Sequence, residues 1–171
     1  MTLNKEQLAE RIEEEGLIQD YIHLETQLQP AGFDVTAGEI HRFKEAGKLD
    51  FSNSEREIPE TEKLEPVKKD EGDDYGWWKL EPGAYKVVMN EKVDIPEDFV
   101  GVAHPRSSLL RMGCTIGNAL WEPGYTGPGE FVLIVQNPEG VEIKENARLN
   151  QLTFEEIDET EGYSGAYHEG E

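Results

Sequence analysis

The chain has 171 residues, of which 16 are Lys or Arg and 37 are Asp or Glu, so its formal net charge at pH 7 is −21. This charge argues against sequence-independent binding to nucleic acid or to an anionic membrane, because both would repel the protein. The hydrophobic fraction of 36%, with 17 Gly in addition, is ordinary for a globular protein, so the acidity does not indicate a disordered chain.

The N-terminal segment predicts one short amphipathic helix over residues 5–15. Asn4 is a typical N-cap, Leu8 and Ile12 follow at helical spacing, and Gly16 ends the segment. The segment lacks the basic and apolar regions of a signal peptide, and no window of the chain approaches 18 apolar residues. We therefore expect a cytoplasmic protein that does not cross a membrane.

From residue 21 onward, the apolar runs shorten to about five to eight residues separated by Pro, Gly, Asn and Asp, which is typical of short β-strands. Residues 51–76 are more highly charged and predict an excursion with one short strand. The pattern favours an all-β fold, an antiparallel jelly roll or a distorted barrel, in a single domain of residues 1–171 with a tail over 158–171. The expected strands are 33–35, 83–90, 99–103, 115–116, 130–137, 141–143 and 149–157.

A single cysteine, Cys114, excludes an intrachain disulfide and an all-cysteine metal site, and it indicates an intracellular protein. Its neighbours are largely apolar, which predicts an inert, packed thiol rather than a nucleophile.

The segment that follows the strand at 99–103 carries a cation and two hydroxyls. Arg106, Ser107 and Ser108 stand at the start of a helical turn, where side-chain donors and backbone N–H groups together suit a phosphate chain. The alternative is a helix N-cap with Arg106 in a surface ion pair.

The run from Asn118 to Gly127 predicts a hairpin because it contains Pro-Gly and flanking glycines. Glu122 and Tyr125 would lie near the end of that hairpin. A carboxylate there could deprotonate a water, and an aromatic ring could face a sugar or base. The alternative is a plain turn in which Glu122 is solvated and Tyr125 packs.

Two polar residues interrupt expected strands. Asp34 lies within an apolar strand, so its carboxylate must face solvent, a partner or the water shell of a bound cation. Gln151 lies inside the strand 149–157, where a cross-strand hydrogen bond would also explain it.

Four segments in this order resemble the successive motifs of the dUTPase and dCTP deaminase superfamily, especially those of its archaeal-type dUTPases. They are LQPAGFDV at 28–35, HPRSSLLRMG at 104–113, NALWEPGYTG at 118–127 and RLNQLTF at 148–154. The resemblance implies the distorted jelly-roll or barrel fold of the dUTPase-like (β-clip) type. It also implies a homotrimer, and Mg²⁺ bound to the triphosphate of the substrate.

The same resemblance implies roles for residues that contact the nucleotide. Arg106, Ser107, Ser108 and Gln151 would hold the phosphates. The hairpin would cradle the pyrimidine and the deoxyribose, with contributions from its Asn118 and Tyr125.

Two carboxylates also match the motifs of the family. Asp34 matches the Asp near the water shell of Mg²⁺, so it is a metal-site candidate that acts through water. Glu122 stands where the family has the Asp that activates the attacking water, and is the catalytic candidate although it is one methylene longer.

The fold supports both hydrolysis and deamination, so the choice between the two reactions has to be made from individual residues. Deaminases of this superfamily carry a Glu that shuttles protons in the strand after the hairpin. Counting back from Asn137 places Ile134 at that position, with Glu130 four residues earlier. Since isoleucine moves no proton, deamination is disfavoured, whereas hydrolysis between the α and β phosphates keeps its required parts.

The C-terminal segment resembles the tail with which the family closes its site. Tyr163 and Tyr167 match the two aromatic positions, while Ala166 and His168 replace the expected Lys and Gln. We therefore expect aromatic closure by the two tyrosines.

The resemblance predicts a dUTP diphosphatase that produces dUMP and pyrophosphate, keeps uracil out of DNA and supplies dUMP for dTMP synthesis. The spread of acidic residues along the chain is typical of a halophilic protein, and the alternative is an ordinary acidic surface that keeps the protein soluble. Two alternatives remain open: a dCTP deaminase or bifunctional enzyme, and a non-catalytic nucleotide-binding module.

Overall fold

The computed structural model describes residues 1–165 and 167, and its first helix, α1 (Lys5–Glu15), has the bounds that the sequence predicts. Asn4 Oδ1 accepts a hydrogen bond from the backbone N of Gln7 (3.0 Å), and the Gln7 side chain accepts one from the backbone N of Asn4 (3.1 Å), forming a capping box. Gly16 ends the helix at φ 74°, a left-handed conformation that suits glycine. Two apolar side chains of α1 are buried.

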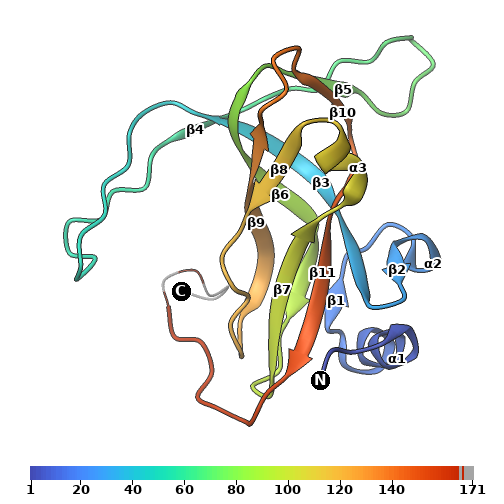
Figure 1. The fold of residues 1–171 in the computed structure, drawn as a ribbon, viewed down its shortest axis with the longest axis vertical. Coiled ribbons are helices and arrows are strands. Elements are labelled where there is room, and N and C mark those ends of the chain that lie inside the picture. The colour runs from blue at the N-terminus through green and yellow to red at the C-terminus, as the bar shows by residue number, and fades with distance from the viewer. Residues whose placement is uncertain (166, 168–171) are drawn as a thin grey trace.

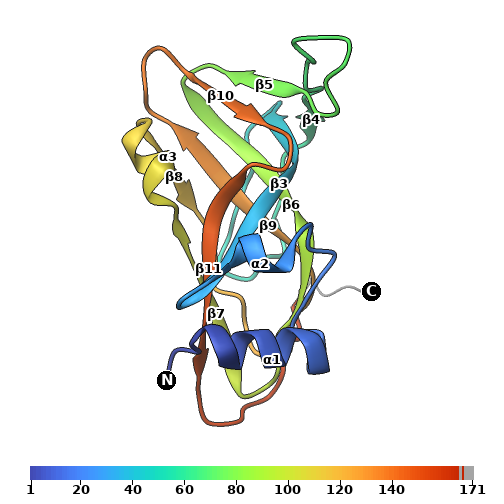
Figure 2. The ribbon, with the colours of Figure 1, turned by 90° about the vertical axis from the view of Figure 1, so that its right-hand side faces the viewer.

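Two shorter helices complete the helical structure of the described residues. The helical turn expected after Arg106 is α3 (Ser107–Arg111). α2 (Leu24–Gln27) was not expected from the sequence. α1 and α2 lie side by side on one flank of the sheet (Figure 2). None of the helices in the described part of the chain is long and apolar enough to span a membrane.

Among the described residues, nine strands form one antiparallel sheet, and two more form a small second sheet. The strands of the main sheet are β1 (Ile18–Gln19), β2 (Leu28–Gln29), β3 (Gly32–Phe43), β4 (Thr61–Lys63), β6 (Gly83–Asp94), β7 (Phe99–Pro105), β8 (Cys114–Gly117), β9 (Thr126–Val135) and β11 (Arg148–Glu156). The second sheet pairs β5 (Trp77–Leu80) with β10 (Val141–Lys144).

The main sheet curls into a nearly closed barrel (Figure 1). Its path runs β7-β11-β3-β6-β9-β8. Gly101 in β7 and Trp121, which follows β8, exchange two backbone hydrogen bonds of 2.9 and 3.0 Å. This bridge brings the two edges of the sheet together and confirms the predicted all-β, barrel-like fold.

The inward faces of the strands supply the core. β6 and β9 alternate buried and less buried residues along most of their length, as expected for strands with one face inside. The largest apolar side chains with essentially no exposed surface include Phe33, Ile40, Leu133, Leu152 and Phe154. Cys114 is buried as well, and burial raises the pKa of its thiol, which agrees with the predicted inert cysteine.

The strand predictions missed the short strands β1 and β2, missed β5 and ended β3 too early. β3 does not stop at residue 35 but continues to Phe43, because His41 and Arg42 pair with both β4 and β6 despite their polarity. β5 was missed because its pairing partner, β10, lies more than 60 residues later in the chain. The excursion over 51–76 contains β4 as its short strand, as predicted.

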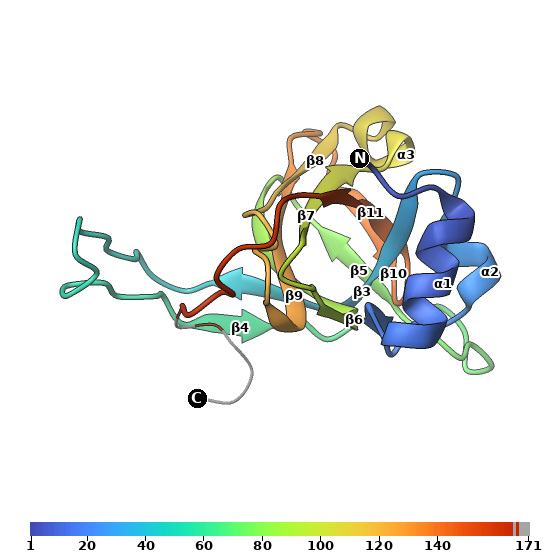
Figure 3. The same ribbon diagram turned by 90° about the horizontal axis from the view of Figure 1, so that it is seen from below.

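The segment that links β3 to β4, residues 44–60, forms an extended ribbon that we call the arm. Two backbone hydrogen bonds between Lys48 and Glu57 (2.9 and 3.0 Å) hold its two sides together. The arm projects from the barrel on the same side as the tail, which begins at residue 158 (Figure 3).

Candidate functional site

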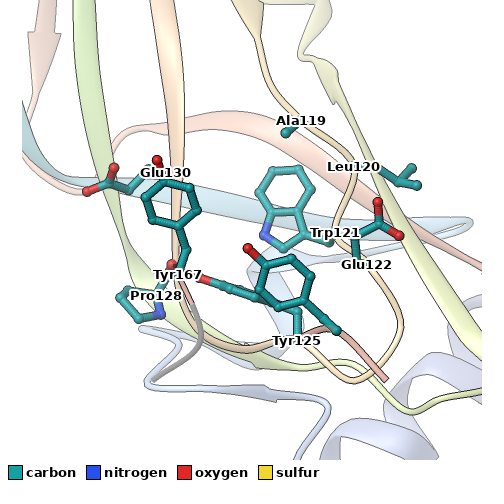
Figure 4. A pocket seen from close by; sticks show the side chains of 9 residues that line it. Ala119, Leu120, Trp121, Glu122, Tyr125, Pro128, Glu130 and Tyr167 are labelled. Atoms are coloured by element: carbon teal, nitrogen blue, oxygen red, sulfur yellow. Dashed lines mark hydrogen bonds between the residues drawn. The ribbon is translucent and has the colours of Figure 1, made fainter. Parts of the chain in front are cut away.

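A cavity of about 750 Å³ lies beside the hairpin that joins β8 to β9. Its lining combines aromatic and aliphatic side chains with two carboxylates, which stand on opposite sides of Trp121 and Tyr125 (Figure 4). This combination suits a flat, partly apolar ligand that carries polar groups. The lining residues are Ala119, Leu120, Trp121, Glu122, Tyr125, Pro128, Glu130, Tyr163 and Tyr167.

Backbone contacts at three residues, on both sides of Glu122, anchor the hairpin. Trp121 is 6% exposed and is held by its bridge to Gly101. Gly124 N donates to Ile95 O (2.8 Å), and Ile95 N donates to Tyr125 O (2.9 Å). Glu122, between these anchors, is exposed at the cavity. A rigid turn therefore carries the solvent-accessible carboxylate predicted to be catalytic.

The turn itself requires a glycine. Gly124 has φ 75°, and a Cβ placed on it would lie 2.8 Å from the Cα of Gly162 in the tail. Both the backbone conformation and the close approach exclude larger residues there.

The tail follows the hairpin of its own chain. Tyr163 N donates to Pro123 O (2.7 Å), and the rings of Tyr163 and Tyr125 meet edge to face with centroids 5.7 Å apart. Tyr163 and Tyr167 both line the cavity. The structure thus brings together four of the predicted residues: Glu122, Tyr125, Tyr163 and Tyr167. The expected substitutions at 166 and 168 lie outside the described residues.

Asn118 is not among the residues that line the cavity. Its side-chain amide donates to the carbonyl of Ala119 at 3.0 Å, near the start of the hairpin.

The other predicted residues form a second cluster where β3, β7 and β11 meet. Gln151 in β11 pairs with Asp34 in β3 and with His104 in β7. Arg106 follows β7, and its backbone N donates to Leu149 O at 3.0 Å. Sheet register alone therefore brings Arg106, Asp34 and Gln151 together.

The centre of this cluster is a buried carboxylate between two guanidinium groups. Asp34 is 2% exposed, and its Oδ2 lies 3.0 Å from Nε of Arg106 and 3.1 Å from Nη1 of Arg148. Burial raises the pKa of Asp34, and the positive charges of Arg106 and Arg148 oppose that rise. Ser107 and Ser108, which follow Arg106 in the chain, are exposed.

A second buried carboxylate, Glu91 in β6, is linked to this cluster through Thr36 and Gln27. It accepts hydrogen bonds from Thr36 N (2.9 Å), Thr36 Oγ1 (2.7 Å) and Gln27 Nε2 (2.6 Å). Gln27 Nε2 also donates to the backbone oxygen of Asp34 (3.0 Å). Burial raises the pKa of Glu91, and these hydrogen bonds work in the opposite direction.

Sequence reasoning missed several residues of both clusters. Arg148 and Glu91 act through contacts that join segments more than 50 residues apart, which no local pattern reveals. Glu130 was considered only as a misaligned proton shuttle. It faces the cavity because it occupies an outward position in the alternation of β9, and that alternation was a usable signal.

The two clusters do not converge within one chain. Trp121, beside Glu122, pairs with Gly101, and Ser107 lies six residues further along β7 and its extension. At about 3.3 Å per residue, the backbone of Ser107, where α3 begins, is about 20 Å from that of Gly101.

A family model and several known proteins are similar to most of this chain. The model of the family described as dCTP deaminase-like matches residues 2–157. A probable deoxyuridine 5'-triphosphate nucleotidohydrolase of Archaeoglobus fulgidus is 40% identical over 166 residues, which cover 96% of this chain and 94% of the relative. The corresponding probable enzyme of Methanosarcina mazei is 44% identical over 153 residues, covering 88% and 86%.

Two further proteins extend the comparison. The deoxyuridine 5'-triphosphate nucleotidohydrolase of Methanocaldococcus jannaschii is 38% identical over 144 residues, covering 84% of this chain and 88% of the relative. The crystal structure of 2'-deoxycytidine 5'-triphosphate deaminase from Agrobacterium tumefaciens superposes with a TM-score of 0.62 at 19% identity, covering 90% of this chain and 47% of that chain. At this identity the structural likeness shows the fold alone.

Proposed function

Because the chain belongs to the dCTP deaminase-like family, we propose that it hydrolyses dUTP to dUMP and pyrophosphate. The names of its relatives at about 40% identity over most of the chain support this activity. The observation that carries the proposal is the exposed carboxylate of Glu122 on a rigid hairpin at an aromatic cavity.

The cavity is proposed to hold the nucleoside. Its aromatic lining offers stacking surfaces for a pyrimidine, and Tyr125, fixed by a hydrogen bond from its hydroxyl to Pro128 O (2.8 Å), would pack on the deoxyribose. That packing would exclude a ribose 2′-hydroxyl, and a narrow cleft would exclude the methyl group of thymine. Asn118 would contribute from the base of the hairpin.

Glu122 is the proposed general base. It would accept a proton from a water molecule that attacks the α-phosphorus, and pyrophosphate would leave from the opposite side. An exposed carboxylate beside the cavity can reach such a water without any rearrangement of the hairpin.

Arg106, Ser107, Ser108 and Gln151 are the proposed phosphate ligands. The Arg guanidinium provides a charged donor pair and the serines provide hydroxyls. Since Ser107 lies about 20 Å along the backbone from Gly101, which pairs beside Glu122, we propose that a second copy supplies the phosphate ligands and that the enzyme is a homotrimer with shared sites.

Mg²⁺ is the proposed cofactor, and the described residues contain no group of three or more His, Cys, Asp or Glu that could cage it. That fits a cation that arrives on the substrate phosphates and keeps most of its waters. Asp34, buried and in contact with two guanidinium groups, suits an indirect role through a metal-bound water rather than direct ligation. Mg²⁺ bound to the substrate phosphates would neutralise part of their negative charge.

Deamination is not favoured. Ile134, at the position where the deaminases carry their Glu, pairs with Ala84 in β6 and Thr115 in β8 and offers no group that moves a proton. We propose a cytoplasmic role in removing dUTP and supplying dUMP.

The deciding experiment incubates the purified protein in about molar KCl with Mg²⁺ and either dUTP or dCTP, and assays pyrophosphate and ammonia separately. Pyrophosphate from dUTP without ammonia from dCTP is the expected result. Ammonia from dCTP would show a deaminase, and binding of dUTP without any product would show a nucleotide-binding module.

A further inference from the structure

One cation of the arm is left without a carboxylate partner. Lys44 pairs with Glu60 at 3.0 Å and Lys48 pairs with Glu57 at 2.8 Å, so both lysines are neutralised within the arm. Arg56 has no ion pair with any residue that the structure describes, and its side chain is only partly exposed. Arg56 differs from the two lysines of the arm because the contact that its guanidinium makes is with an aromatic ring.

The Arg56 guanidinium reaches the cavity through the tail. Its Cζ lies 5.4 Å from the ring centroid of Tyr167, and Tyr167 lines the cavity. No described residue accepts a hydrogen bond from the Arg56 side chain, so its N–H groups stay available while the ring holds the cation. The contact therefore places these N–H donors next to a side chain that lines the cavity.

The cavity lacks the charge that its proposed substrate needs. Within the described residues, its lining contains Glu122 and Glu130 but neither Lys nor Arg. The nearby Lys86 is already committed to Glu130 at 3.0 Å. A triphosphate next to these carboxylates needs cations from outside the lining, and Arg56 would add to the proposed Mg²⁺ and to the Arg106 that a second copy supplies.

We infer that Arg56 is a substrate-binding residue that donates to the triphosphate of the nucleotide in the cavity, with Tyr167 as its platform. The inference rests on the proposed function, since it takes a nucleoside triphosphate as the ligand. It gives the arm a role: the ribbon carries a cation from β3 and β4 to the tail side of the cavity. A nucleoside monophosphate, with its shorter phosphate chain, would not reach the guanidinium.

The test compares Arg56→Gln with Lys48→Gln, a matched control that removes a paired cation from the same arm. Calorimetry at one fixed ionic strength measures the Kd of the full chain for dUTP and for dUMP, and a steady-state assay measures KM and kcat. Loss of one charge-assisted hydrogen bond should weaken dUTP binding and raise KM about tenfold in Arg56→Gln. The dUMP affinity and kcat should stay within about twofold, and Lys48→Gln should match the wild type.

Two outcomes would overturn the inference. One is an unchanged dUTP affinity in Arg56→Gln, and the other is an equal loss for dUTP and dUMP, which would indicate a structural role for the arm. Arg56→Lys keeps the charge and should recover part of the dUTP affinity. Failure of the proposed function shows separately, as a wild-type protein that binds dUTP but releases no pyrophosphate, because the Kd comparison does not need turnover.

Discussion

Nε of Arg106 lies 3.0 Å from Oδ2 of Asp34, although the two residues are 72 positions apart and sit on different strands. Asp34 also holds Arg148, so one buried carboxylate fixes two guanidinium groups whose side chains stay about 30% exposed. Arg106 is therefore held in one orientation beside Ser107, as its proposed role in phosphate binding requires. Such pre-orientation lowers the conformational cost of binding.

Asp34→Asn should disrupt this arrangement. Loss of the charge leaves two guanidinium groups facing a neutral amide, so we expect the free energy of unfolding to fall by about 2 kcal/mol. KM for dUTP should rise several-fold, because Arg106 loses its fixed orientation. Chemical denaturation and steady-state kinetics measure the two effects.

The control is Asp20→Asn, an equal charge change at an exposed residue whose φ of 57° suits Asn. It should leave both quantities unchanged. An Asp34→Asn protein with wild-type stability and KM would show that the two arginines need no carboxylate to hold them.

Glu122→Gln should lower kcat by about 10²-fold or more, since it keeps the shape of the side chain and removes the proposed base. KM should change little. The readout is release of pyrophosphate from dUTP at saturating substrate.

Glu130→Gln is the matched control, because Glu130 lines the same cavity and pairs with Lys86. Its kcat should stay within several-fold of the wild type. If Glu130→Gln lost activity while Glu122→Gln kept it, the two carboxylates would have to exchange roles.

Glu91 should make stability depend on pH. Its pKa is raised by burial, so the folded protein holds this proton more tightly than the unfolded chain does. The stabilisation is fully present below the ordinary pKa of 4.5 and is lost as pH rises through the raised value.

Denaturation of the wild type and of Glu91→Gln between about pH 4.5 and 7.5 tests this. The wild type should lose stability relative to the variant as pH rises, by at most about 1.4 kcal/mol per pH unit. Glu13→Gln, on the exposed side of α1, should run parallel to the wild type. A constant difference between wild type and Glu91→Gln across this range would mean that Glu91 does not titrate there.

Asn150 is fully buried, and neither its Nδ2 nor its Oδ1 has a hydrogen-bond partner within the described part of the chain. An unsatisfied buried amide costs about 1–3 kcal/mol. Asn150→Ala should therefore raise the free energy of unfolding by about 1 kcal/mol after the loss of packing is subtracted.

Asn90→Ala is the contrasting variant, because the Asn90 amide donates to Thr36 (2.8 Å) and Asn146 (2.9 Å). It should be destabilised. A clear loss of stability in Asn150→Ala would instead reveal an internal water bound to that amide.

Local signals in the sequence were sufficient for the elements that local interactions define. The N-terminal helix was predicted to the residue because Asn4 and Gly16 cap it, and the hairpin was predicted because Pro123 and Gly124 form its turn. The short helix α2 carried no such signal. Its end is fixed by Gln27, which contacts Glu91 64 residues away.

In the candidate site, too, some residues could be located from local sequence and others depend on contacts between distant segments. Motif order located Glu122, Tyr125 and Arg106, but the contact of Asp34 with Arg148 depends on the register of β3 and β11. How far Ser107 stands from Glu122 depends on where Gly101 pairs. Neither property is encoded in any short segment of the sequence.

Salt should govern both stability and activity. The net charge of −21 creates self-repulsion that ions screen, and the screening length falls from about 10 Å at 0.1 M to about 3 Å at 1 M. The two ion pairs of the arm, Lys44 with Glu60 and Lys48 with Glu57, are exposed and would gain nothing from salt. Since repulsion is the larger effect, Tm and kcat/KM should both rise between 0.1 and 2 M KCl. Full activity together with an unchanged Tm at 0.1 M would contradict a halophilic design and leave the acidic surface as an aid to solubility.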